Sequence, residues 1–381
     1  MDKFNYEDIR PYNISEIKKA VKRIKTDKTF FKSIKFLFPE FTDDIINKKL
    51  DSINSVYDFQ KEFMHIGIRR IIDKFSDGLE YNNFNYLDKN TPYLFISNHR
   101  DIFLDSGILQ VILFENNFDT TQITFGNNLM YPGLITDIGK INKMFTVYRG
   151  GNAKEFYNNS LRLSSYIRHV ITEKKTSVWI AQRNGRTKNG YDETQIALIK
   201  MLMSSEKDFT KSIKELNIIP VSVSYEYEPC DNLKTNEIYI SQTREYIKTK
   251  DEDLKSILQG VIQQKGKITL NFGKPLNNEL NGILDIKNKN KKVNLIKNII
   301  DKSIYANYKL YANNFIAFDI LNKTDKYKDK YTDNEKQKFN TYVDEKIKYI
   351  NGNKNTIKNI FLDIYANPVV TANLKIKNQQ C

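Results

Sequence analysis

Short apolar runs alternate with helix-patterned segments between residues 93 and 272, and this alternation strongly constrains the fold. The runs have the length and composition of β-strands and cover residues 93–96, 123–125, 146–148, 178–181, 218–225 and 268–272. Apolar residues at helical spacing fill most of the intervals, and Asn152 with Glu155 is typical of the cap of a helix over 153 to about 171. Strands that alternate with helices predict an α/β protein whose sheet is covered by helices on both faces.

Helical spacing also dominates both ends of the 381-residue chain. Ile17, Ala20, Val21 and Ile24 share one helix face, and similar spacing recurs beyond residue 277. We therefore expect an N-terminal helical region over 1–90, an α/β domain over 91–276 and a helical C-terminal extension over 277–381. The polar stretch 322–333 is expected to be a mobile connection.

The formal net charge of +14 favours anionic partners, such as nucleic acid, an acidic membrane surface or a phosphorylated substrate. Charge alone does not choose among them. With two cysteines and three scattered histidines, the chain offers neither a disulfide framework nor a zinc cluster, so no metal is expected. Without an apolar segment of about 20 residues, we expect a cytoplasmic protein that is soluble or peripheral at the inner face of the membrane.

The stretch around His99 is the most informative for chemistry. His99 follows an apolar strand, and Asp101 and Asp105 come two and six residues later. In open α/β sheets, the loops after the carboxyl ends of strands bind ligands. A histidine there, oriented by a carboxylate, suits general base catalysis because its pKa lies near working pH. The alternative is a helix-capping aspartate beside an incidental histidine, and the stretch alone leaves both open.

Asn98-His99 followed by a nearby aspartate resembles the first motif of the glycerolipid acyltransferase family, which acylates glycerol-3-phosphate and lysophosphatidic acid. The family signature is His-x4-Asp, whereas five residues separate His99 from Asp105 here. The resemblance implies that His99 is the catalytic base and that an aspartate orients it. We favour Asp105, because Leu104-Asp105 before an apolar helix matches the end of the motif, and keep Asp101 as the alternative orienting acid.

Two further segments resemble the substrate-binding motifs of the family. The stretch 143–150 resembles a strand that ends in an arginine, and this implies that Arg149 holds the acceptor phosphate. The stretch 179–186 resembles a strand that runs into Glu-Gly-x-Arg. By this resemblance Gly185 lets the backbone approach the ligand, Arg186 and Arg183 offer charge to the phosphate, and Asn184 replaces the usual glutamate.

The remaining likeness lies in 218–223, an apolar strand with Pro220 near its start, and in 267–276, which resembles the closing strand of such domains. Together the motifs cover 94–276 in the family's order. They imply a mixed sheet flanked by helices, of the glycerol-phosphate acyltransferase type. They also imply an O-acyltransferase of phospholipid synthesis that uses acyl-CoA or acyl carrier protein as donor, a glycerol-phosphate acceptor and no cofactor.

Two other functions remain open at this point. Asn184 and the long His99–Asp105 spacing are compatible with an inactive family member that binds lipid or acts as a scaffold. A basic nucleic-acid-binding protein would fit the charge, but the chain lacks a recognisable module of that class. For an enzyme that acts on lipid, tracts 17–24 and 30–38 are candidates for contact with an anionic membrane; the alternative is that they are helices packed on the protein.

Overall fold

The computed structural model describes residues 4–206, 208–249, 251–283 and 286–377. Within them, seven strands form one sheet in the order β1-β7-β6-β2-β5-β3-β4. The strands are β1 (Leu79–Asn82), β2 (Leu94–Ser97), β3 (Gln122–Gly126), β4 (Met144–Val147), β5 (Val178–Ala181), β6 (Ile218–Tyr225) and β7 (Ile268–Phe272). Strands β2 to β6 are parallel, whereas β7 pairs antiparallel with β6 and parallel with β1. The predicted α/β fold with a mixed sheet is confirmed.

Helices of the described residues fall into three groups along the chain. The first group is α1 (Ile14–Ile24), α2 (Lys28–Leu37), α3 (Asp43–Asp51), α4 (Val56–Phe59), the π-helix η1 (Gln60–His65) and α5 (Ile66–Phe75). The second is η2 (Phe84–Tyr86), α6 (Leu104–Glu115), η3 (Asn127–Leu129), α7 (Leu134–Ile141), α8 (Ala153–Thr172), α9 (Ile196–Leu202), α10 (Phe209–Lys214), α11 (Asp231–Ser241) and α12 (Glu252–Ile262). The third is α13 (Asn277–Asn281), α14 (Lys289–Asn307), α15 (Ala312–Asn322), η4 (Lys328–Lys330), α16 (Asp333–Ile347) and α17 (Lys354–Lys377).

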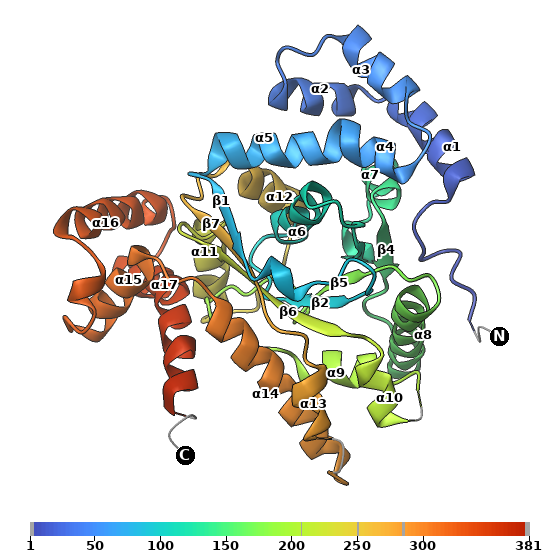
Figure 1. Cartoon of the computed structure of the whole chain (residues 1–381). Helices are drawn as coiled ribbons and strands as arrows, with labels where there is room; N and C mark the ends of the chain where they lie inside the picture. The colour runs from blue at the N-terminus through green and yellow to red at the C-terminus, as the bar shows by residue number, and fades with distance from the viewer. Residues whose placement is uncertain (1–3, 207, 250, 284–285, 378–381) are drawn as a thin grey trace.

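Both faces of the sheet are buried, and the side chains of β2 show how. Leu94 and Ile96 belong to one apolar core with α8, α9 and α14, whereas Phe95 belongs to another with α5 and α6. Successive side chains of a strand point to opposite faces, so a continuous apolar run is what a doubly covered strand requires. Figure 1 shows α5 and α6 above the sheet and α8, α9 and α14 below it.

Strand β1 corrects the sequence interpretation, which took residues 1–90 as helical. Its four residues pair with β7, with Leu79 opposite Ile268. Three of the four are exposed at the edge of the sheet, so the segment lacks the apolar pattern that identified the buried strands. A second difference is smaller: the strand predicted over 146–148 is β4, which begins at Met144.

The two tracts considered for membrane contact are helices α1 and α2, whose apolar sides pack inward. Ile17, Ile24, Phe30 and Ile34 are buried in one cluster with other N-terminal helices. These side chains therefore follow the second alternative considered for the two tracts, in which they are helices packed on the protein. Within the described ranges, no helix combines the length and hydropathy needed to cross a membrane.

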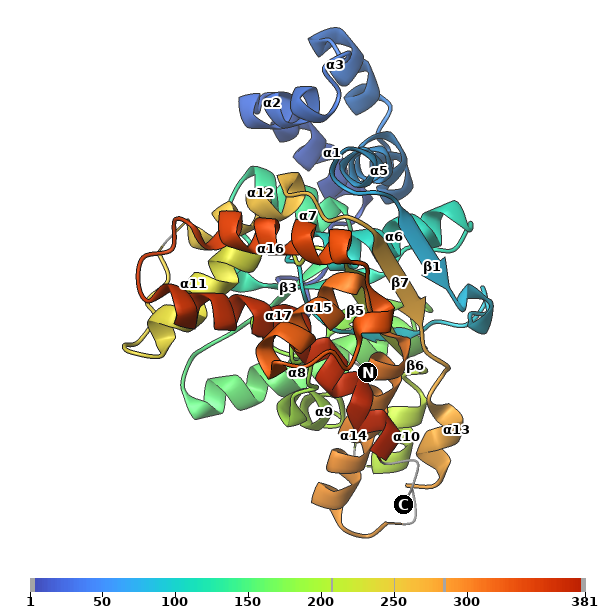
Figure 2. The same cartoon turned by 90° about the vertical axis from the view of Figure 1, so that its left-hand side faces the viewer.

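The third group of helices is closely attached to the rest of the protein. Helix α14 shares the core beneath the sheet, and α15, α16 and α17 form a separate apolar cluster beside α11. Figure 2, which faces this side, shows α15 and α17 in front of the sheet. Part of the segment 322–333, predicted as a mobile connection, forms the short helix η4.

Candidate active site

A cavity of about 420 Å³ lies at the carboxyl ends of parallel strands β2, β3, β4 and β5. Because these strands are parallel, the loops that follow them meet at one edge of the sheet. Six of the residues predicted from sequence line this cavity, although they come from three separate segments: His99, Arg149, Arg183, Asn184, Gly185 and Arg186.

His99 and Asp105 form a hydrogen-bonded pair at the wall of the cavity. Nδ1 of His99 lies 2.9 Å from Oδ2 of Asp105, and a carboxylate accepts, so Nδ1 is the donor. Asp105 is fully buried, and its Oδ1 accepts a hydrogen bond of 2.8 Å from the hydroxyl of Tyr225. The His99 side chain is 13% exposed. With Nδ1 engaged, Nε2 is the ring nitrogen available to take a proton from a ligand.

Asp101, the alternative orienting acid, is used differently. Its Oδ1 accepts from the backbone N–H groups of Phe103 and Leu104 at 2.9 and 2.7 Å, which stabilises the first turn of α6. Its Oδ2 faces Gly260 of α12. Burial and the neighbouring charge of Asp105 raise the pKa of Asp101. The predicted contact of His99 is therefore made by Asp105, and the long spacing is accommodated because residues 98–103 form a loop before the helix starts.

The cationic side of the cavity is built after β4 and β5. Arg149 follows β4, and its backbone N–H donates to Oδ1 of Asn127. Arg183 and Arg186 follow β5, in a turn where Gly185 has a φ of +75°, a conformation that favours glycine. Nε of Arg183 and Nη1 of Arg186 are buried and find no hydrogen-bond acceptor among the described residues. Such donors suit an anion, because buried donors are normally paired.

Asn184, where the sequence resemblance led us to expect a glutamate, is exposed at this turn. Its backbone N–H donates to Oε1 of Gln195 at 2.8 Å. This bond ties the backbone of the turn to Gln195, the residue that precedes α9.

No family model and no curated protein matches the chain. Among solved structures, the chain is similar to the 1-acyl-sn-glycerophosphate (LPA) acyltransferase PlsC from Thermotoga maritima, with a TM-score of 0.39 and 12% sequence identity. This similarity covers 77% of the present chain and 95% of that protein.

An apolar groove of about 650 Å³ adjoins the polar cavity. The two share lining residues at the ends of β3 and β5, including Phe125, Ala181 and Arg183. The groove is lined further by side chains of α8 and α9, namely Phe156, Tyr157, Leu163, Leu198 and Met201. The site can therefore hold a ligand with an anionic end and an apolar end.

Several residues that support His99 could not be recognised from the sequence. Tyr225 is 120 positions from Asp105, and its burial beside that carboxylate raises its pKa well above the usual value, so it stays a hydrogen-bond donor. The Trp179 ring lies edge-on to the His99 ring at 5.9 Å between centroids, and its Nε1 donates to Oγ of Ser97. Trp179 and Ser97 lie in segments that resemble family motifs, whereas Tyr225 lies beyond the motif stretch 218–223.

Other candidates for chemistry are not assembled in the described part of the chain. It contains no group of three or more His, Cys, Asp or Glu side chains placed to hold a metal ion. Cys230 is buried, and desolvation raises its pKa to about 11, which disfavours the reactive thiolate.

Proposed function

We propose that the chain is an O-acyltransferase that moves a fatty acyl group from an acyl thioester to a hydroxyl of glycerol-3-phosphate or 1-acylglycerol-3-phosphate. The observation that carries the proposal is the position of the Asp105-bound His99 in a cavity lined by Arg149, Arg183 and Arg186. The donor is acyl-CoA or acyl carrier protein, and the reaction belongs to phospholipid synthesis.

In the proposed reaction, Nε2 of His99 removes the proton from the acceptor hydroxyl as its oxygen attacks the thioester carbonyl. The buried carboxylate of Asp105 stabilises the imidazolium that forms. When the carbon–sulfur bond breaks, the leaving thiolate takes the proton from Nε2. The acyl group is then on the acceptor oxygen, and His99 returns to its neutral state.

The arginines supply position rather than chemistry in this proposal. Two or three guanidinium groups that hold one phosphate would fix the distance of the acceptor hydroxyl from His99, and such positioning accounts for a large part of many rate enhancements. The neighbouring apolar groove would take the acyl chain, since transfer of its methylene groups from water is favourable by about 0.8 kcal/mol each.

The direct test is an acyl-transfer assay with both acceptors and both donors. We expect transfer by the wild-type chain and a loss of at least about 100-fold in His99→Ala, the usual contribution of a general base. His65→Ala is the matched control, because His65 also bonds a carboxylate, Glu115, but lies on the N-terminal helices away from the cavity.

The alternatives predict other results. An inactive lipid-binding member of such a family would bind acyl chains and show no transfer with any of the four pairs of substrates. If the wild-type chain transfers acyl groups and His99→Ala keeps full activity, the chain is an acyltransferase but His99 is not its base.

A further inference from the structure

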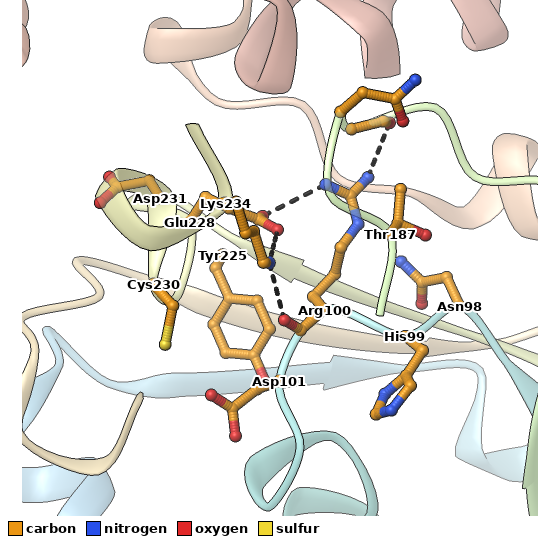
Figure 3. Close-up of polar contacts among 12 residues, drawn as sticks. Asn98, His99, Arg100, Asp101, Thr187, Tyr225, Glu228, Cys230, Asp231 and Lys234 are labelled. Carbon is orange, nitrogen blue, oxygen red and sulfur yellow. Dashed lines mark hydrogen bonds and ion pairs between the residues drawn. The ribbon is translucent and has the colours of Figure 1, made fainter. Parts of the chain in front are cut away.

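Arg100, next to the proposed base, is fully buried and makes ion pairs with two carboxylates. Its Nη2 lies 2.7 Å from Oδ2 of Asp192, and its Nη1 lies 3.2 Å from Oε2 of Glu228. Figure 3 shows the Arg100 side chain pointing away from that of His99, so it does not reach the cavity. A buried arginine is costly unless its charge and donors are satisfied, and the two carboxylates provide this.

Asp192 joins the loop of the base to the loop of the arginines. Besides Arg100, its Oδ2 accepts from Nδ2 of Asn98 at 3.1 Å, and its Oδ1 accepts from the hydroxyl of Thr187 at 2.7 Å. Thr187 directly follows Arg186, and its backbone N–H donates to the carbonyl of His99 at 2.7 Å. The two sides of the site are therefore connected by a buried network around one carboxylate.

The backbone of Arg100 ties this network to Asp105. Its N–H donates to Oδ2 of Asp105 at 2.6 Å, the oxygen that His99 contacts. Its carbonyl accepts from Nζ of Lys234 at 2.8 Å, and Lys234 in turn lies 2.6 Å from Oε1 of Glu228. Two cations, Arg100 and Lys234, thus balance two carboxylates, Asp192 and Glu228, in the buried cluster. Figure 3 shows the contacts of Glu228 with Arg100 and Lys234.

The C-terminal helix α17 supports the loop that carries Asp192. Gly190 has a φ of +77°, and a Cβ there would lie 2.0 Å from the carbonyl oxygen of Ile364 in α17. The carbonyl of Gly190 accepts from Nη2 of Arg100 at 3.0 Å, and Nδ2 of Asn367 in α17 donates to the carbonyl of Asn189 at 2.7 Å. The loop therefore sits directly on the helix.

We propose that Arg100 and Asp192 are positioning residues that hold His99 in register with the loop of Arg183 and Arg186, and that α17 braces this arrangement. The inference rests on the proposed acyltransferase function and gives it a new component. Without the network, the arginines would still bind a phosphate, but the acceptor hydroxyl would no longer be aligned with Nε2 of His99.

The test is the double variant Arg100→Met/Asp192→Asn. It removes one charge of each sign, so the Glu228–Lys234 pair stays balanced, whereas Arg100→Met alone would leave a buried carboxylate uncompensated. We expect kcat to fall about 100-fold, a loss that a misplacement of about 1 Å can cause. The KM of the acceptor and the Kd of inorganic phosphate should stay within about threefold of wild type, because Arg149, Arg183 and Arg186 are unchanged.

The matched control is Arg168→Met/Glu215→Gln, which removes a largely buried ion pair between α8 and the end of α10, away from the cavity. This control should change the melting temperature about as much as Arg100→Met/Asp192→Asn does, but it should leave kcat unchanged. Should the first double variant fail to fold, Thr187→Val removes one bond to Asp192 with little change of shape. It should lower kcat roughly fivefold, as loss of one hydrogen bond of about 1 kcal/mol predicts.

Each outcome is decisive. An unchanged kcat would overturn the positioning role, and a fall in kcat with an equal loss of phosphate affinity would indicate a merely structural role. His99→Ala is measured in parallel. If it is inactive while the double variant is fully active, only this inference fails; a wild-type chain without transfer would overturn the proposed function and this inference with it.

Discussion

Replacement of Asp105 by asparagine separates the charge of the orienting acid from its hydrogen bonds. Oδ2 of Asp105 faces three donors: Nδ1 of His99 at 2.9 Å and the backbone N–H groups of Arg100 and Asp101 at 2.6 and 2.9 Å. In Asp105→Asn, the amide oxygen must stay on this side, because an amide NH₂ there would meet three donors. The amide nitrogen then faces the hydroxyl of Tyr225, which can accept as well as donate.

The expected loss of rate follows from the missing charge. At about 4 Å between charge centres and an effective dielectric constant near 20, a carboxylate stabilises an imidazolium by about 4 kcal/mol. The imidazolium exists only while His99 holds the transferred proton, so this energy is lost mainly from the transition state. A barrier higher by about 4 kcal/mol lowers kcat roughly 1,000-fold.

The assay compares kcat and the thermal midpoint of Asp105→Asn with those of Asp101→Asn. The second variant keeps an oxygen for the N–H groups of Phe103 and Leu104, so we expect it to retain kcat within about tenfold. Both should keep midpoints near that of the wild type, since most of their hydrogen bonds persist. Asp105 is not the orienting acid if Asp105→Asn keeps more than a tenth of the wild-type kcat, or if Asp101→Asn is the slower enzyme.

Further predictions concern the substrates and the buried thiol. Arg149→Gln and Arg186→Gln should each raise the acceptor KM about 10- to 100-fold with less effect on kcat, because one charge-assisted bond contributes about 1.5–3 kcal/mol; steady-state kinetics would contradict this if only kcat fell. Ala197→Trp, at an exposed position that lines the apolar groove, should reduce transfer of long acyl chains more than short ones in competition assays. A pKa near 11 leaves about one thiolate of Cys230 in a thousand at pH 8, and this fraction rises tenfold per pH unit up to the pKa. In Cys381→Ser, thiol reagents should therefore react fast with the protein only after denaturation, and rapid labelling of the native protein at pH 8 would contradict the burial.

The buried strands could be predicted from the sequence because burial on both faces leaves a visible pattern. In β2 and β5, every residue or nearly every one is apolar and buried, and the predicted runs overlap the observed strands. The edge strand β1 has the opposite property: Glu80 to Asn82 face solvent, and the strand forms because β7 offers it a hydrogen-bonding edge. No local pattern encodes a partner that lies almost 190 residues further along the chain.

The choice between Asp101 and Asp105 was open in sequence but could be argued from helix geometry. On a regular helix, residues six apart lie about 240° apart around the axis, so His99 and Asp105 could not meet if both were helical. The structure resolves this with a loop from 98 to 103, in which Asp101 caps the helix and Asp105 turns back to His99. The helix cap gives Asp101 a structural role, which the His-x4-Asp signature alone did not predict.

Arg100 and Asp192 show where prediction from one sequence ends. Arg100 adjoins His99, yet the neighbouring sequence does not indicate that its side chain is buried in the interior and points away from the cavity. Asp192 lies in a stretch without motif, and one carboxylate among 46 acidic residues carries no signal. Their role appears only when the fold places Asn98, Arg100 and Thr187 around the same carboxylate. A motif names the groups that touch a substrate, but the groups that keep them aligned are chosen by tertiary packing. For this reason the network that holds His99 in register with the arginines had to come from the structure.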